Sequence, residues 1–314
     1  MRDLVAAGYV DRRPGSGTFV RLQEAHQASL IGLLIPDLGE TEVFEPICGE
    51  IVRACQQHKL SVVWGDSSSV ESNSQEQRAV QLCERYIEQR MAGVFFAPIE
   101  LSESMSRTNT RIAESLTRAG IAVVLLDRDI VDLPGRSRFD VVGIDNFRAG
   151  MVLTQHLLDQ QAKNIVYIAR QFSAATVERR IAGYEFSLAQ NSARQKPVVM
   201  YGEPDNFEFI DQLMAARPDA IVCANDQTAA QVQRALNVRG INVPDQVRIV
   251  GLDDVNYAEL LAVPLTTLRQ PCREIGAAAV RSMVERLENR TMPARDVYVK
   301  TELVVRQSCG ARLT

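Results

Sequence analysis

The chain has 314 residues, which exceeds one typical domain, so two lobes are the natural expectation. Apolar residues make up 46% of the sequence, which is enough to build packed cores and excludes a disordered chain. The net charge is −4, but residues 1–21 carry four arginines against two aspartates. The remainder therefore has a charge of about −6, which argues against nucleic-acid binding by the main body.

The cysteines show no CxxC motif and no regular spacing, which indicates free thiols in a reducing compartment. They are Cys48, Cys55, Cys83, Cys223, Cys272 and Cys309. The N-terminus lacks the apolar segment of a signal peptide, and no window approaches the roughly eighteen continuous apolar residues of a membrane span. The sequence therefore predicts a cytoplasmic protein.

Residues 1–22 have the pattern of a helix end followed by a basic β-hairpin. Gly8 stands where a residue with left-handed backbone conformation commonly ends a helix. Residues 14–17 supply a turn between strand-like residues 9–10 and 18–20. The side chains expected to contact a DNA duplex are Arg12, Arg13, Ser16 and Thr18.

The residue order of this segment, small-Gly-aromatic-Val and then Arg-Arg-Pro-Gly-Ser-Gly-Thr-Phe-Val, resembles the end of the recognition helix and the wing of GntR-type winged helix-turn-helix repressors. The resemblance covers only the C-terminal remnant of such a domain. We therefore expect this chain alone to bind duplex DNA weakly, with operator DNA a partner only where the full winged helix is present.

From residue 30 onward, short runs rich in Val, Ile and Leu alternate with longer segments of helical period. The predicted strands are 30–35, 60–64, 93–96, 122–126, 141–144, 164–169, 198–201, 220–223 and 248–252. The predicted helices are 43–59, 75–90, 146–160, 176–190, 206–216, 227–239 and 273–289. This alternation predicts an α/β fold of two doubly wound parallel-sheet lobes, because so many strands exceed one comfortable sheet.

Polar residues follow directly after many of these strands, where open α/β sheets bind their ligands. They are Pro36-Asp37, Gly65-Asp66-Ser67, Asp127-Arg128, Asp145-Asn146, Asn225-Asp226 and Asp253-Asp254. Carboxylates and guanidinium groups suit adjacent sugar hydroxyls, and a Phe ring can cover the apolar face of a sugar. The sequence therefore predicts a cleft for a small polar ligand.

Residues 30–308 resemble the effector-binding core of LacI/GalR-type repressors, which has the type I periplasmic binding protein fold. The resemblance rests on motifs in the family order: residues 31–37 (IGLLIPD), 127–128 (DR), 142–146 (VGIDN), 178–184 (ERRIAGY), 223–226 (CAND), 243–245 (VPD), 250–254 (VGLDD) and 264–271 (PLTTLRQP). A GntR-type wing joined to this core resembles the arabinose-repressor arrangement.

The resemblance implies a domain plan and a ligand site. Residues 1–22 would be the wing remnant and 23–29 a linker, the first lobe about 30–140 and 271–293, and the second about 141–270 and 294–308, joined by three crossing strands. The implied ligand contacts are Phe44, Asp127, Arg128, Arg180, Phe207, Asn225, Asp253 and Gln270, with Asp66 added from strand order.

Several of these residues also have structural interpretations. Phe44 lies on an apolar helix face and could belong to the core, and Arg128 could form a salt bridge between the lobes. Asp253-Asp254 could cap the following helix. The pair Asn225-Asp226 could likewise cap the helix that begins near residue 227, with Asp226 the expected cap.

The favoured function is the effector-sensing domain of a bacterial GntR/LacI-type transcriptional regulator that forms a homodimer and binds a monosaccharide or a derivative. The alternative is a sugar-binding protein without a DNA-binding function. A glycosidase-like enzyme is disfavoured, because no GxSxG, Walker loop or Cys/His pairing occurs. The three histidines are scattered, so no metal site, no cofactor and no membrane partner are expected.

Overall fold

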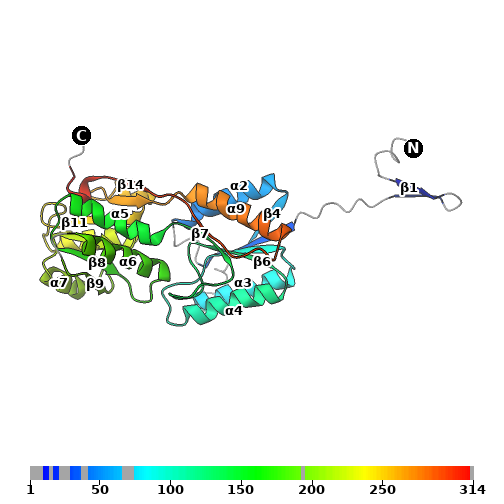
Figure 1. Ribbon diagram of the computed structural model, residues 1–314, viewed down its shortest axis with the longest axis horizontal. Coiled ribbons are helices and arrows are strands. Elements are labelled where there is room, and N and C mark those ends of the chain that lie inside the picture. Colours follow the sequence, from blue (N-terminus) through cyan, green and yellow to red (C-terminus); the bar gives the residue numbers. More distant parts are fainter. Residues whose placement is uncertain are drawn as a thin grey trace.

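The computed structural model describes residues 29–36, 42–65, 74–191 and 195–311, together with the backbone of residues 10–13 and 17–20. The main body consists of two lobes, each built around a six-stranded sheet with helices on both faces (Figure 1). This confirms the predicted α/β fold with two doubly wound parallel-sheet lobes.

The first lobe contains a fully parallel sheet with the order β13-β7-β6-β5-β3-β4. Its strands are β3 (Ser29–Leu34), β4 (Leu60–Trp64), β5 (Gly93–Phe96), β6 (Ala122–Leu126), β7 (Asp140–Gly143) and β13 (Asp296–Tyr298). Helices α2 (Phe44–Gln57) and α9 (Cys272–Glu288) cover one face, and α3 (Gln75–Glu88) and α4 (Met105–Arg118) cover the other (Figure 1). The central strands are buried on both faces, which explains their continuous apolar sequences.

The second lobe contains a sheet with the order β14-β12-β11-β10-β8-β9, parallel except for the pair β12 and β14. Its strands are β8 (Ile165–Ala169), β9 (Val198–Tyr201), β10 (Ala220–Cys223), β11 (Arg248–Asp253), β12 (Thr266–Arg269) and β14 (Glu302–Val304). Helices α5 (Asn146–Asp159) and α6 (Ala175–Gln190) pack on one face, and α7 (Phe207–Ala215) and α8 (Asp226–Val238) on the other.

The chain crosses between the lobes three times, after β7, between β12 and α9, and after β13. Strand β7 pairs with β6 on one side and with β13 on the other, with Val141 opposite Asp296. Residues 141–143 and 296–298 therefore lie in the first lobe, not in the second where the sequence analysis placed them. The reason is that backbone pairing to β6, which the sequence motif does not reveal, decides the lobe to which these strands belong.

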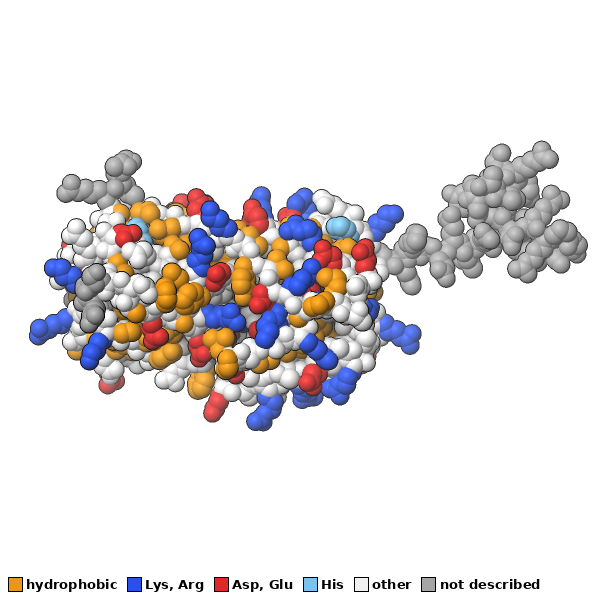
Figure 2. Space-filling view, in the orientation of Figure 1, with side chains coloured by type: hydrophobic (Ala, Val, Ile, Leu, Met, Phe, Trp, Pro, Cys, Tyr) orange, Lys and Arg blue, Asp and Glu red, His pale blue; other side chains and the backbone are white. Residues whose placement is uncertain are grey.

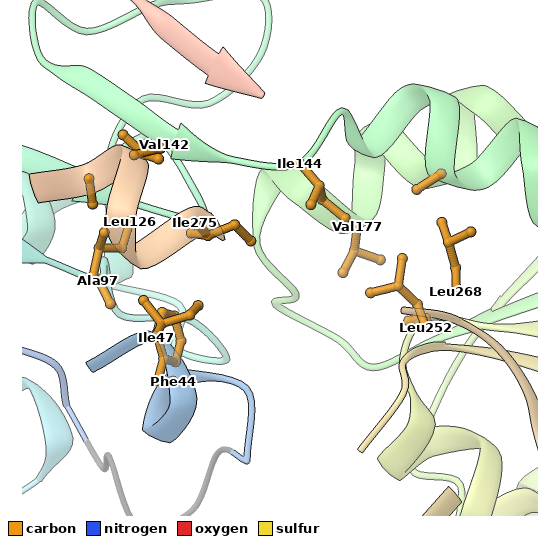
Figure 3. Packing of buried hydrophobic residues seen from close by; sticks show 14 of the residues in the cluster. Phe44, Ile47, Ala97, Leu126, Val142, Ile144, Val177, Leu252, Leu268 and Ile275 are labelled. Atoms are coloured by element: carbon orange, nitrogen blue, oxygen red, sulfur yellow. The ribbon is translucent and has the colours of Figure 1, made fainter. Parts of the chain in front are cut away.

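One hydrophobic cluster runs through both lobes. Figure 3 shows its labelled members in two groups: Phe44, Ile47, Ala97, Leu126, Val142 and Ile275 in the first lobe, and Ile144, Val177, Leu252 and Leu268 in the second. Each lobe has a further cluster beneath its outer helices. The six cysteines are free thiols, and all but Cys272 are buried.

Among the described α-helices and strands of the main body, α4, β12, β13 and β14 were not predicted from the sequence. Helix α4 has the sequence MSRTNTRIAESLTR, in which few apolar residues mark the helical period. Strands β12, β13 and β14 are short and contain Thr, Asp, Arg or Glu in place of a continuous apolar run. Such strands take their structure from pairing with their neighbours, and β12 pairs with β11 and β14.

The N-terminal hairpin is present as an antiparallel pair of β1 (Val10–Arg13) and β2 (Gly17–Val20), in which Arg12 lies opposite Thr18. Ser16 and the side chains of Arg12, Arg13 and Thr18 lie outside the described residues. On the visible face of the main body, basic and acidic side chains are interspersed (Figure 2). Among the described helices, none combines the length and apolar character that a membrane crossing requires.

Candidate ligand-binding cleft

A cavity of about 190 Å³ lies between the lobes, at the carboxyl ends of strands from both sheets. Both lobes contribute walls, so a ligand here would touch the two halves of the molecule at once. The lining residues are Glu42, Val43, Phe44, Glu100, Asp127, Arg128, Thr176, Val177, Arg180, Asn225, Gln227, Asp253, Val255, Tyr257 and Gln270.

In the first lobe, the charged wall is centred on Arg128, which follows β6. Its Nη1 lies 2.6 Å from Glu100 Oε2, and its Nε lies 2.9 Å from Asp127 Oδ2. Burial disfavours the charged guanidinium, but the carboxylates of Glu100 and Asp127 outweigh it and raise the pKa of Arg128. The Arg128 Cζ also lies 6.0 Å from the centroid of the Phe44 ring. The charges of the guanidinium and the carboxylates in this wall therefore partly cancel each other.

The backbone has a positive φ at two carboxylate residues that line the cleft and at the adjacent Asp254. The φ angles are 67° at Asp127, 126° at Asp253 and 59° at Asp254, values that side-chain-bearing residues seldom adopt. Gly143 leaves room beside Asp127, since a Cβ there would lie 3.1 Å from the Asp127 carbonyl oxygen. Such backbone concentrates at ligand sites, where the surrounding structure holds it in place.

In the second lobe, Arg180 projects from α6 and is buried. Its Nε donates to Asn146 Oδ1 at 2.8 Å, and its Nη1 donates to the Ala224 carbonyl oxygen. Helices α5 and α6 approach closely because Gly150 and Gly183 lack side chains. A Cβ on Gly150 would lie only 1.9 Å from the Arg180 carbonyl oxygen. This glycine contact sets the position of Arg180 relative to α5.

Asp253 ends β11 and faces Gln270, whose Nε2 donates to Asp253 Oδ1 at 2.7 Å. Burial raises the pKa of Asp253 to about 7, although Arg180 and the Gln270 hydrogen bond act in the opposite direction. Nearby, the buried Asp226 accepts from Thr267 Oγ1 at 2.6 Å and from the Val255 backbone N–H at 3.1 Å. Burial, and then the Asp253 charge, raise the pKa of Asp226 as well.

Most of the predicted ligand contacts converge on this cleft. Those that line it are Phe44, Asp127, Arg128, Arg180, Asn225, Asp253 and Gln270. Phe207 is not among them. It begins α7, is 44% exposed, and lies 4.8 Å beneath the guanidinium of Arg239. Phe207 was assigned to the ligand site from a loop that has no recognisable motif. The sequence therefore did not show that this residue lies away from the cleft. Asp66 lies outside the described residues.

The structural alternatives have mixed outcomes. Phe44 is both a core residue and a cleft residue. Arg128 pairs within its own lobe, so the interlobe salt bridge is wrong. The cap of α8 is Asn225, which accepts from the Thr228 backbone N–H at 2.9 Å, and not Asp226, whose carboxylate turns inward to bind Thr267.

Likewise, Asp253 and Asp254 do not cap the following turn. The 3-10 helix η2 (Asn256–Glu259) begins after Val255 without a side-chain cap. Asp254 instead pairs with Arg269 at 2.6 Å and with Arg306 at 2.7 Å. These ion pairs connect the end of β11 to β12 and the C-terminal segment, which holds the Asp253 backbone in position.

Several lining residues were not predicted from the sequence, and Glu100 is the most important of them. Three residues separate it from the end of β5, so it escaped a search limited to the residues directly after strands. Thr176 and Tyr257 come from the N-terminus of α6 and from η2. Within the described residues, no cluster of three or more His, Cys, Asp or Glu side chains is placed to hold a metal ion.

The lobes also touch at the rim of the cleft. The Leu101 backbone N–H donates to the Phe172 carbonyl oxygen at 2.9 Å, which joins the segment after β5 to the segment after β8. Burial alone would raise the pKa of Glu100, but Arg128, Arg180 and the Ala174 backbone amide together lower it. Ala174 precedes α6, so Glu100 faces the N-terminus of a helix in the other lobe, where a carboxylate is electrostatically favoured.

Comparisons with known proteins agree with this architecture. Residues 154–309 match the periplasmic binding protein-like domain. The chain is 29% identical over 230 residues to the HTH-type transcriptional repressor PurR of Vibrio campbellii, a match covering 70% of this chain and 65% of that protein. It is 25% identical to the arabinose metabolism transcriptional repressor of Geobacillus stearothermophilus, covering 98% of this chain and 84% of that protein.

Among solved structures, the transcriptional regulator CelR in complex with cellobiose has a similar fold. The TM-score is 0.75 and the sequence identity 23%, and the superposition covers 98% of this chain and 88% of the other.

Proposed function

We propose that this periplasmic binding protein-like chain is the effector-sensing part of a bacterial transcriptional regulator, and that a sugar-like ligand in the interlobe cleft controls DNA binding. The observation that carries the proposal is the convergence of Asp127 and Arg128 from one lobe with Arg180 and Asp253 from the other on a single cavity. A ligand that bridges these groups stabilises the lobe arrangement in which they face each other.

The chemistry of the walls favours a neutral, hydroxyl-rich ligand. Asp127 and Asp253 can accept from adjacent hydroxyls, Arg180 can donate in a forked geometry, and Asn225 and Gln270 offer both functions. Phe44 supplies an apolar surface for a ring face. The repressor of arabinose metabolism and the regulator solved with cellobiose, both similar to this chain, support a saccharide as the ligand class.

The proposed output is DNA binding by a homodimer. The hairpin of β1 and β2 has the antiparallel pairing of a wing, and we assign it to a GntR-type winged helix. Arg12, Arg13, Ser16 and Thr18 are the proposed backbone or groove contacts of that wing. A change in the angle between the lobes alters the distance between two such DNA-binding domains in a dimer. Because operator half-sites lie at a fixed spacing, the altered distance changes the affinity for DNA.

The test is a thermal-shift screen followed by isothermal titration calorimetry, with monosaccharides, disaccharides and sugar phosphates as probes and amino acids as the control class. We expect a neutral saccharide to raise the melting temperature and to bind with one-to-one stoichiometry. An amino acid that binds where all saccharides fail would overturn the ligand assignment. Unchanged operator affinity of the intact regulator on addition of a saccharide that binds would overturn the regulatory assignment.

A further inference from the structure

A second compartment of about 380 Å³ adjoins the interlobe cleft. The two compartments share Phe44, Glu100, Arg128, Val177, Asn225 and Gln227 as lining residues, so the Glu100–Arg128 ion pair borders both of them. The first compartment holds the charged and amide groups that suit one polyhydroxylated ring. The second is the larger of the two and is also lined by both lobes.

The walls of the second compartment are amphipathic. On the side of the first lobe, Pro98, Ile99 and Leu101 form an apolar surface in the segment after β5. On the side of the second lobe, Ser173 and Arg170 present polar groups from the segment after β8. An apolar surface opposite hydrogen-bonding groups suits a sugar ring, which has an apolar face and a rim of hydroxyls.

The charges of this compartment are internally balanced. The Arg170 guanidinium is paired with Glu203, with Nε 3.0 Å from Oε2, and Arg128 is paired with Glu100 at 2.6 Å. A phosphate or carboxylate group would find both cations already engaged by carboxylates and would lie beside the negative partners. The compartment therefore suits a neutral group better than an anionic one.

We propose that the second compartment is a subsite for a second sugar ring, so that the effector is a neutral two-ring saccharide and not a free monosaccharide. The inference rests on the proposed sensing function and deepens it. One ring lies against Phe44 among Asp127, Arg180 and Asp253. The bond between the rings passes the Glu100–Arg128 pair, and the second ring packs on Pro98 and Ile99.

The experiment compares matched pairs of probes by isothermal titration calorimetry: glucose with cellobiose, galactose with lactose, and xylose with xylobiose. In the wild-type chain, at least one disaccharide should bind about tenfold or more tightly than its own monosaccharide. Ser173→Phe fills the second compartment and should remove that difference, while the affinity for the monosaccharide changes less than about threefold.

Two further variants keep the result interpretable. Arg239→Ala is the matched control, because Arg239 pairs with Asp211 at 2.6 Å and lines neither compartment. It should leave the preference for the disaccharide intact. Leu101→Trp fills the compartment from the opposite lobe at a side chain that is 41% exposed, and it replaces Ser173→Phe if that variant fails to fold.

The outcomes separate this inference from the proposed function. If monosaccharides bind as tightly as their disaccharides, or if Ser173→Phe and Leu101→Trp weaken both probes equally, the second subsite is refuted and saccharide sensing stands. If no probe of either class binds while another ligand class does, the proposed function fails and the inference fails with it.

Discussion

Arg180→Ala is the sharpest test of the cleft. Arg180 is buried, and the described contacts occupy two of its five N–H groups, with Asn146 and the Ala224 carbonyl oxygen as acceptors. At most three donors therefore remain for a ligand. The substitution removes these donors and also removes the positive charge that holds the pKa of Asp253 down. The neighbouring carboxyl group then becomes protonated more readily and is a poorer acceptor.

The size of the effect follows from this geometry. A hydrogen bond from a charged group contributes about 1.5–3 kcal/mol, so the loss of two such bonds weakens binding about 100-fold or more. At a ligand concentration of about 100 times Kd, the wild-type chain gains about 2.7 kcal/mol, or roughly 5–10 °C in Tm. At the same concentration, a 100-fold weaker variant gains about 0.4 kcal/mol, or roughly 1 °C.

The assay is differential scanning fluorimetry with and without a saccharide that stabilises the wild-type chain. Arg239→Ala is the matched control, because Arg239 is a half-exposed arginine that pairs with Asp211 at 2.6 Å away from the cleft. It should keep the full ligand-induced shift. Circular dichroism of the ligand-free Arg180→Ala variant confirms that it folds. A full ligand-induced shift in a folded Arg180→Ala variant would refute the site.

Three further predictions concern other residues. Phe207→Ala should change saccharide affinity less than about twofold by calorimetry, because this ring does not line the cleft, and a tenfold loss would return it to the site. Asp140→Ala should lower the free energy of unfolding in urea by about 3–5 kcal/mol, because it leaves Arg286 buried without its partner at 2.8 Å; a loss under about 1 kcal/mol would contradict this. Since the pKa of Asp253 is raised to about 7 in the folded chain, the protonated carboxyl stabilises the fold fully below about pH 4. This stabilisation is lost as pH rises through about 7. Ligand hydroxyls favour the ionised form, so saccharide affinity should rise between about pH 6 and pH 8, and Asp253→Asn should flatten that profile.

Much of the fold could be predicted from local sequence. Strands β5, β6 and β10 have the predicted bounds, because each is a short apolar run buried on both faces and bordered by polar or turn residues. The elements that escaped prediction depend on partners distant in sequence. Strand β13 pairs with β7, more than a hundred residues earlier, and with three residues it is too short to stand out as an apolar run.

The candidate site divides in the same way. The position of Asp127 and Asp253 at strand ends was evident from the sequence, since the carboxyl ends of parallel strands share one edge of a sheet. The sequence did not show which partner each charged side chain takes. Arg128 binds Glu100 and Asp127 of its own lobe, and Asn225 caps α8 in place of the expected Asp226, which accepts a hydrogen bond from Thr267.

The sequence by itself determined that this chain builds two α/β lobes and gathers hydrogen-bonding side chains where their strands end, because strand burial and helical period are local properties of the chain. Only the tertiary structure decided that Phe207 lies away from the cleft, that Glu100 belongs to it, and that a second compartment adjoins it. Those outcomes depend on how the two lobes pack against each other, and contacts between segments distant in sequence leave no local pattern to read.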